Sequence, residues 1–286
     1  MTRIGLVAFD LDGTLLNGLG GASTRSIDTL HRLLGAGISI ASISGRNVQK
    51  SQAPFADDLG SRFFVGSYNG ALVLSAAEGG DRRLLLEQRL PKPEFDELVA
   101  FVSDRRMNFV YCGCEVDGAG VDEAYMTDRD TASIRNLNTL TGIEFVFDAL
   151  LCDRIQDGEL RPSPKLILMP GNECRDRTLS EVTKIFRDRL YIARTGDDRI
   201  EVMHPEVNKA VALQSICSAC GVDMENTLAV GDGDNDLPML REAGVGVLMG
   251  NADDETRASA DTSGVVHCPS LEEEGFSRTI EQYVLN

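Results

Sequence analysis

The sequence predicts an α/β fold in which a Rossmann-like core with a parallel sheet carries an inserted α/β domain. Short apolar strands alternate with helical patterns at both ends of the chain, which is typical of a parallel sheet. The pattern changes near a polar stretch at 76–83, and the first pattern resumes after residue 202. With 286 residues, the chain is long enough for two domains. The expected parts are a core at 1–82 and 203–286 and an inserted domain at 83–202.

The first core segment contains a clear strand–helix–strand succession. The apolar run Ile4–Phe9 predicts a strand that ends at Asp10. Ser23-Thr24 can cap a helix whose apolar residues fall on one face, and Gly35 and Gly37 can end it. The further expected strands of this segment are 38–43 and 62–68.

The inserted domain and the second core segment alternate in the same manner. In the inserted domain we expect a helix from about Pro93, a helix at 173–188, and strands at 84–90, 107–112, 165–169 and around 190–203. In the second core segment, Asn208-Lys209 opens a helix that Gly221 stops. The elements expected after it are a strand at 227–230, a helix at 237–243 and a strand at 245–248.

The charge of the chain excludes two classes of partner. A net charge of −17 argues against nucleic acid and against an anionic membrane, because both require a basic surface. No apolar run approaches the ~20 residues of a membrane helix. Met1-Thr2-Arg3 leads directly into the first strand rather than into a signal peptide. We expect a cytoplasmic monomer or small homo-oligomer.

The cysteines and histidines carry no predicted role. Seven scattered cysteines, an odd number, do not form a disulfide framework. The spacings Cys112-Gly113-Cys114 and Cys217/Cys220 are compatible with zinc, but the second pair lies on an apolar helical pattern, so packing is the simpler explanation. His31, His204 and His267 fit no catalytic spacing.

The most informative segment is Asp10-Leu11-Asp12-Gly13-Thr14, where the first strand ends. In an open α/β sheet, ligands bind at the carboxyl ends of the strands. If the strand stays extended, Asp10 and Asp12 point the same way, and two neighbouring carboxylates favour a bound cation. A carboxylate beside a metal can attack a phosphoryl group. The segment therefore predicts a metal site with a nucleophile.

Three further sites lie at strand ends or at a helix start: Ser44-Gly45, Lys209, and Asp232 with Asn235-Asp236. Each has an ordinary interpretation, as a turn, a loop or a solvated helix end. Their common placement at the functional ends of their elements favours one shared site.

The order Asp-x-Asp-Gly-Thr, Ser-Gly-Arg, Lys and Gly-Asp-Gly-x-Asn-Asp resembles the haloacid dehalogenase-like phosphohydrolases. The large insertion between the second and third motifs resembles their Cof-type branch, as do Asn69-Gly70-Ala71 and the segment 243–252. Ser44 stands where many relatives carry Thr, and both supply a hydroxyl. The resemblance covers the core closely and the inserted domain only in its length and alternation.

The resemblance implies a Mg²⁺-dependent phosphatase that hydrolyses small phosphorylated metabolites, with sugar phosphates as candidates, through an aspartyl-phosphate. Asp10 is the expected nucleophile, and Asp12 the expected general acid and base. The expected Mg²⁺ ligands are Asp10, Asp232 and the backbone carbonyl of Asp12, with Asp236 orienting a metal-bound water. The expected phosphate-binding residues are Leu11, Ser44, Gly45, Lys209 and Asn235.

The inserted domain is expected to act as a cap that selects the leaving group. Arg129, Asp130 and Arg135 either line the interface or lie on a solvated face. Two other functions stay open: a phosphomutase that uses the same aspartyl-phosphate, and a non-catalytic sensor of a phosphorylated metabolite. The sensor is disfavoured because every chemical position is intact.

Overall fold

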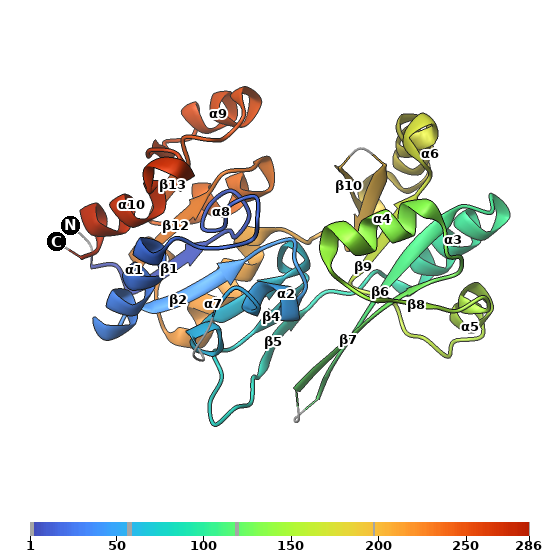
Figure 1. Ribbon diagram of the computed structural model, residues 1–286, viewed down its shortest axis with the longest axis horizontal. Helices are drawn as coiled ribbons and strands as arrows, with labels where there is room; N and C mark the ends of the chain where they lie inside the picture. The colour runs from blue at the N-terminus through green and yellow to red at the C-terminus, as the bar shows by residue number, and fades with distance from the viewer. Residues whose placement is uncertain (1–2, 56–58, 118–119, 197, 286) are drawn as a thin grey trace. The chain divides into compact units, whose positions relative to one another are not determined.

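The computed structural model describes residues 3–55, 59–117, 120–196 and 198–285 (Figure 1). The chain forms two compact units: a core unit of Met1–Glu87 with Asn208–Asn286, and an inserted unit of Gln88–Val207. The boundaries expected at 82/83 and 202/203 are therefore too early. Strand β5 (Leu84–Glu87) pairs with β4 (Leu72–Leu74) in the core sheet, whereas Met203 pairs with Lys165 in the inserted sheet.

The core sheet confirms the predicted α/β class. Its eight strands are ordered β14-β13-β12-β1-β2-β3-β4-β5, and six of them, from β14 to β3, run parallel. The parallel strands are β14 (Val266–His267), β13 (Val245–Leu248), β12 (Thr227–Gly231), β1 (Leu6–Phe9), β2 (Ser39–Ile43) and β3 (Phe64–Ser67). β4 and β5 extend the sheet antiparallel at one edge.

Helices cover both faces of this sheet, as the alternation of β1 shows. Val7 and Phe9 face one hydrophobic cluster, which contains residues of α1 and α10, while Leu6 and Ala8 face a second cluster with residues of α7 and α8. The core helices are α1 (Thr24–Gly35), α2 (Val48–Gln52), α7 (Lys209–Cys220), α8 (Leu237–Glu242), α9 (Asp254–Asp261) and α10 (Gly275–Tyr283). Of these elements, α2, β4, α9, β14 and α10 were not predicted.

The helix boundaries follow the capping residues in the sequence. Ser23 precedes α1, and its side chain accepts a hydrogen bond from the Ser26 N–H. Asn208 does the same at the start of α7, where it accepts from the N–H groups of Ala210 and Val211. Gly221 ends α7 with a φ of 69°, a left-handed conformation that favours glycine.

The inserted unit has its own six-stranded sheet, ordered β10-β11-β9-β6-β7-β8. All its pairs are antiparallel except β7 with β8. The strands are β6 (Asn108–Asp117), β7 (Gly120–Thr127), β8 (Phe145–Phe147), β9 (Lys165–Met169), β10 (Tyr191–Thr195) and β11 (Arg199–Met203). The helices are α3 (Lys92–Asp104), α4 (Ala132–Thr141), α5 (Leu151–Gln156) and α6 (Arg175–Phe186). The strand expected at 84–90 forms as β5 (Leu84–Glu87), but its assignment to the inserted domain was wrong, since β5 pairs with β4 in the core sheet.

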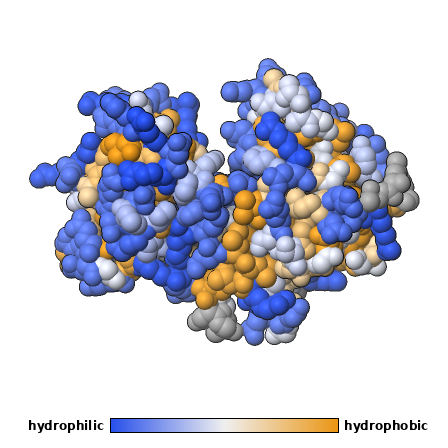
Figure 2. Space-filling view, turned by 180° about the vertical axis from the view of Figure 1, so that it is seen from behind, coloured by the Kyte–Doolittle hydropathy of each residue, from blue (hydrophilic) through white to orange (hydrophobic). Residues whose placement is uncertain are grey.

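The surface view in Figure 2 is largely hydrophilic, in keeping with the net charge of −17. Among the described residues, no helix combines the length and the apolar character that crossing a bilayer requires. Cys217, a residue of α7, is buried in the hydrophobic cluster between this helix and the sheet. This supports packing rather than zinc binding as its role.

Candidate active site

The alternation of β1 directs Asp10 toward α7. Asp10 follows Phe9, so by the period of two it faces the same side of the sheet as Leu6 and Ala8, the side that α7 covers. Its backbone still belongs to the sheet, since the Asp10 N–H donates to the carbonyl of Val230. Lys209 is the first residue of α7, directly after the Asn208 cap. The fold thus brings the first and third motifs together.

Lys209 is a fully buried cation between two carboxylates. Its Nζ donates to Asp10 Oδ1 and to Asp236 Oδ1, each at 2.5 Å, and its exposed fraction is 0%. A buried charge is tolerated only when it is paired and hydrogen-bonded. Burial alone would lower the pKa of Lys209, but the two carboxylates raise it above its usual value. Lys209 is therefore a fixed positive charge beside Asp10.

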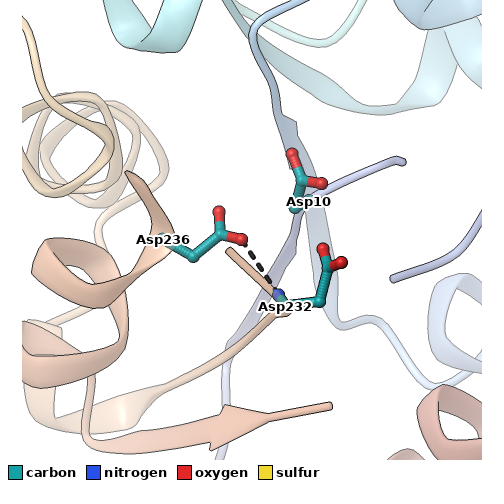
Figure 3. A group of neighbouring side chains, drawn as sticks. All are labelled: Asp10, Asp232 and Asp236. Atoms are coloured by element: carbon teal, nitrogen blue, oxygen red, sulfur yellow. Dashed lines mark hydrogen bonds between the residues drawn. The ribbon is translucent and has the colours of Figure 1, made fainter. Parts of the chain in front are cut away.

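Asp236 orders the loop that follows β12. Its Oδ2 accepts hydrogen bonds from the N–H groups of Asp232 and Gly233, each at 2.9 Å, and Figure 3 marks the first of these. Because Oδ1 already accepts from Lys209, both carboxylate oxygens of Asp236 are engaged. Asp236 is thus better suited to hold this loop than to bind a ligand directly.

Three carboxylates gather around one point. Oxygen atoms of Asp10, Asp232 and Asp236 lie within 4.8 Å of one another (Figure 3), and this is the cluster of potential metal ligands found among the described residues. Burial, together with the neighbouring charge of Asp236, raises the pKa of Asp10 to about 7 and that of Asp232 to about 6. Three carboxylates against one ammonium leave an excess of negative charge. An all-oxygen site of this kind fits a hard divalent cation such as Mg²⁺.

Gly13 allows Asp232 to approach the Asp10 loop. Its φ is +82°, and a Cβ at this position would lie 2.1 Å from Asp232 Oδ2. Thr14 Oγ1 donates to Asp232 Oδ1 at 3.1 Å, and Asn251 Nδ2 donates to the Gly13 carbonyl at 2.9 Å. Residue 13 must therefore be glycine, because the position leaves no room for a Cβ and its positive φ is unfavourable for other residues.

Asp12 lies beyond the end of β1, in the turn that follows Leu11. The strand ends at Phe9, and the chain then turns, with the Leu11 carbonyl accepting from the N–H groups of Leu15 and Leu16. β1 therefore reaches neither Asp10 nor Asp12, and the expected alignment of the two side chains stays a prediction. Arg46 donates from Nε to Asp12 Oδ2 at 2.7 Å and from Nη2 to Oδ1 at 2.5 Å.

Asn69 connects the second motif to the fourth. Its N–H donates to the Ser44 carbonyl at 2.9 Å, and its Oδ1 accepts from Asn235 Nδ2 at 3.1 Å. A Cβ on Gly45 would lie 3.2 Å from the same Asn69 Oδ1. Asn69 has a φ of 57°, a region that Asn tolerates better than most residues. The sequence showed Asn69 only as part of a resemblance, without a role.

The structure thus gathers Asp10, Lys209, Asp232 and Asp236, and it joins Ser44 to Asn235 through Asn69. The Asp12 carboxylate is hydrogen-bonded to Arg46. Arg46, Asn69, Thr14 and Asn251 are site residues to which sequence reasoning gave no role, although Arg46 lies within the recognised Ser-Gly-Arg motif. In the inserted unit, Arg135 forms an exposed ion pair with Asp130 at 2.9 Å, and Arg129 pairs with Asp128.

The sequence matches a known protein family over most of its length. A model of the haloacid dehalogenase-like hydrolase family covers residues 7–280, which include all four motifs. The chain belongs to this family. Among curated relatives, the 5-amino-6-(5-phospho-D-ribitylamino)uracil phosphatase YitU of Bacillus subtilis is 29% identical over 99% of this chain and 98% of its own. The HMP-PP phosphatase of Cronobacter sakazakii is 26% identical over 88% and 85%.

Solved structures agree on the fold. TM0651 from Thermotoga maritima has a TM-score of 0.83 at 21% identity and covers 99% of this chain and 97% of its own. The expectation of an enzyme of the phosphoric monoester hydrolase class is confirmed by the family and by its phosphatase relatives. The haloacid dehalogenase-like assignment likewise holds over both units.

Proposed function

We propose that the protein is a Mg²⁺-dependent phosphatase for small phosphorylated metabolites, sugar phosphates among them, that works through an aspartyl-phosphate on Asp10. The observation that carries this proposal is the buried contact of Lys209 with Asp10 and Asp236, at 2.5 Å each. It fixes one carboxylate oxygen of Asp10. The other, Oδ2, accepts no hydrogen bond from a described residue, so a nucleophilic oxygen remains available.

The first half-reaction transfers the phosphoryl group to the protein. The Asp10 carboxylate attacks phosphorus, and the bond from phosphorus to the ester oxygen breaks. The Asp12 carboxyl gives its proton to that departing oxygen, which leaves as an alcohol. Lys209, the Ser44 hydroxyl, the N–H groups of Leu11 and Gly45, and the Asn235 amide are the proposed partners of the phosphoryl oxygens.

The second half-reaction restores Asp10. The Asp12 carboxylate takes a proton from water while the water oxygen attacks phosphorus, and the bond between phosphorus and Asp10 breaks. Inorganic phosphate is released, and Asp12 is again protonated for the next turnover. Arg46 donates a hydrogen bond to each carboxylate oxygen of Asp12. We therefore assign Arg46 the role of positioning this general acid and base.

Mg²⁺ would be held by Asp10 and Asp232, with the Asp12 carbonyl as the third proposed protein ligand. When bound, it would neutralise the phosphate dianion beside the carboxylates and organise water. Asp236 would support the site without binding the metal, because its hydrogen bonds hold Lys209 and the Asp232 loop in place. The excess of carboxylates over ammonium groups supports this assignment.

The test is a phosphate-release screen with Mg²⁺ over phosphorylated sugars, nucleotides and cofactors, with an aryl phosphate as a general substrate. Asp10→Asn is the matched control, because it keeps the shape of the side chain but removes the nucleophile. Phosphate release by the native protein and not by this variant is the expected result. An isomerised sugar phosphate would identify a phosphomutase, and binding without turnover would identify a sensor.

A further inference from the structure

The inserted unit contains a cavity of about 520 Å³ that the proposed phosphatase chemistry does not use. It lies at the end of the inserted sheet where β6 begins and β9 ends, since Asn108 pairs there with Met169. The chain enters and leaves the unit at the other end of these strands. There, the Leu90 N–H donates to the Ser163 carbonyl and Met203 pairs with Lys165. Every lining residue belongs to the inserted unit.

The cavity is cationic in a strongly acidic protein. Arg105, Arg106, Arg129 and Arg177 line it, against a single acidic lining residue, Glu181. The whole chain has the opposite balance, with 45 acidic and 28 basic residues. Glu181 lies 3.5 Å from Arg105 Nε and 3.1 Å from Arg177 Nε, so two guanidinium groups share one carboxylate. Arg129 pairs with Asp128, which lies 2.9 Å from its Nε. Four guanidinium groups thus face two carboxylates, and the lining keeps an excess of positive charge.

Arg106 is the most informative of these residues. No ion pair or hydrogen bond joins its guanidinium to another described residue, although its carbonyl accepts from Arg129 Nη2 at 2.6 Å. Its φ is +49°, just beyond the end of α3, where the Met107 N–H donates back to the Val102 carbonyl. Glycine is the favoured residue at such a helix end. An arginine in this strained conformation places a free cation at the rim of the cavity.

The remaining wall offers hydrogen-bond donors and apolar surface. Ser133 and Thr178 line the cavity, and their hydroxyl groups form no hydrogen bond with a described residue. Met107, Met169 and Pro170 supply an apolar side. A cavity of this volume is of the size that small-molecule sites have.

We propose that this cavity binds a small organic phosphate that carries at least two negative charges. Guanidinium groups bind phosphate through paired, charge-assisted hydrogen bonds, and four arginines line this cavity. The apolar side would contact the organic part of the ligand. No residue of the core unit lines this site, so none of the residues assigned to the phosphatase chemistry belongs to it.

The experiment is a calorimetric titration in EDTA with two probes, inorganic pyrophosphate and ADP, so that the result does not depend on turnover. We expect both probes to bind, and ADP more tightly because it also contacts the apolar side. Arg106→Gly should weaken binding by about tenfold, which is about 1.4 kcal/mol. The same variant should keep or raise the melting temperature, because glycine relieves the left-handed backbone. Arg177→Gln should also weaken binding.

Arg135→Gln is the control, since Arg135 is an exposed arginine of the same unit that pairs with Asp130 outside the cavity lining. It should leave both affinities unchanged. Hydrogen exchange should show protection by ADP at 105–108 and 169–178. The proposal is overturned if neither probe binds at about 1 mM. It is also overturned if Arg106→Gly and Arg177→Gln bind like the native protein, or if protection is confined to the core unit.

Discussion

Arg46 donates two hydrogen bonds to the carboxylate of Asp12, from Nε to Oδ2 at 2.7 Å and from Nη2 to Oδ1 at 2.5 Å. The two residues are 34 positions apart in the chain. A guanidinium and a carboxylate in this paired arrangement fix each other's orientation as well as their charge. The side chain that we assign as general acid and base is thus held by the loop after β2, although it follows β1 in the sequence.

Arg46→Ala should slow turnover of alkyl phosphates on the order of 10²-fold, because Asp12 loses its orientation. Formation of the aspartyl-phosphate from aryl phosphates should be slowed less, since their leaving groups need little protonation. The loss of rate in Arg46→Lys should be smaller than in Arg46→Ala but still measurable, because an ammonium group cannot bind both carboxylate oxygens in the same plane. The measurement is the single-turnover rate of aspartyl-phosphate formation for both ester types across pH. Arg25→Ala, which removes the exposed 2.6 Å ion pair with Glu281, is the control. An equal loss with both esters would refute the positioning role of Arg46.

Gly13→Ala should abolish tight Mg²⁺ binding, because its Cβ would lie 2.1 Å from Asp232 Oδ2. Gly20→Ala is a matched control in the same segment. Gly20 has a similar φ of +79°, but a Cβ there meets nothing closer than Arg46 Nη2 at 4.0 Å. Both variants carry the cost of a left-handed alanine, of about 1 kcal/mol. Only Gly13→Ala should lose metal affinity in a Mg²⁺ titration. Equal affinities in the two variants would remove Asp232 from the metal site.

Activity should require Mg²⁺, and Ca²⁺ should bind but inhibit. Mg²⁺ demands octahedral geometry near 2.1 Å, whereas Ca²⁺ accepts more ligands at longer distances. The larger ion would draw the second oxygen of Asp10 into its coordination and remove the nucleophile. Initial rates in EDTA, Mg²⁺ and Ca²⁺ check this, and full activity in EDTA would contradict it.

The metal-free protein should lose stability as the pH rises. Burial raises the pKa of Asp10 to about 7 from 3.8. Between these values the folded protein keeps a proton that the unfolded chain has released, so the unfolding free energy falls with increasing pH. Asp10→Asn should show a shallower fall over this range in urea unfolding with EDTA. The difference between variant and native protein should level off above about pH 7. Identical slopes would show that Asp10 titrates at its ordinary value.

The parts of the site that the sequence predicted are those fixed by position along one element. Asp10 directly follows a buried strand, Lys209 begins a capped helix, and Asp232 directly follows another strand, so their meeting follows from a parallel sheet. The resemblance to the haloacid dehalogenase-like family supplied their roles.

The parts that it missed depend on where the chain turns and which sheet a strand joins. The expected alignment of Asp10 and Asp12 assumed a strand that extends to both residues, whereas β1 ends at Phe9 and Gly13 takes a φ of +82°. The sequence pattern of the strand at 84–87 is compatible with either unit, and only its pairing with β4 assigns it to the core sheet. The contacts of Asn69 with Ser44 and Asn235 depend on its left-handed backbone, which no periodicity reveals.

The central claim is that Asp10 carries the phosphoryl group and Asp12 moves the protons. The most direct measurement is a rapid acid quench of single turnovers of Asp12→Asn with an aryl and an alkyl phosphate, with Asp10→Asn as the control. Phosphoprotein should accumulate with the aryl ester, because breakdown still needs Asp12 whatever the leaving group was. Formation with the alkyl ester should be slower, on the order of 10²-fold. No phosphoprotein with either ester, or equal slowing of formation with both, would contradict the account.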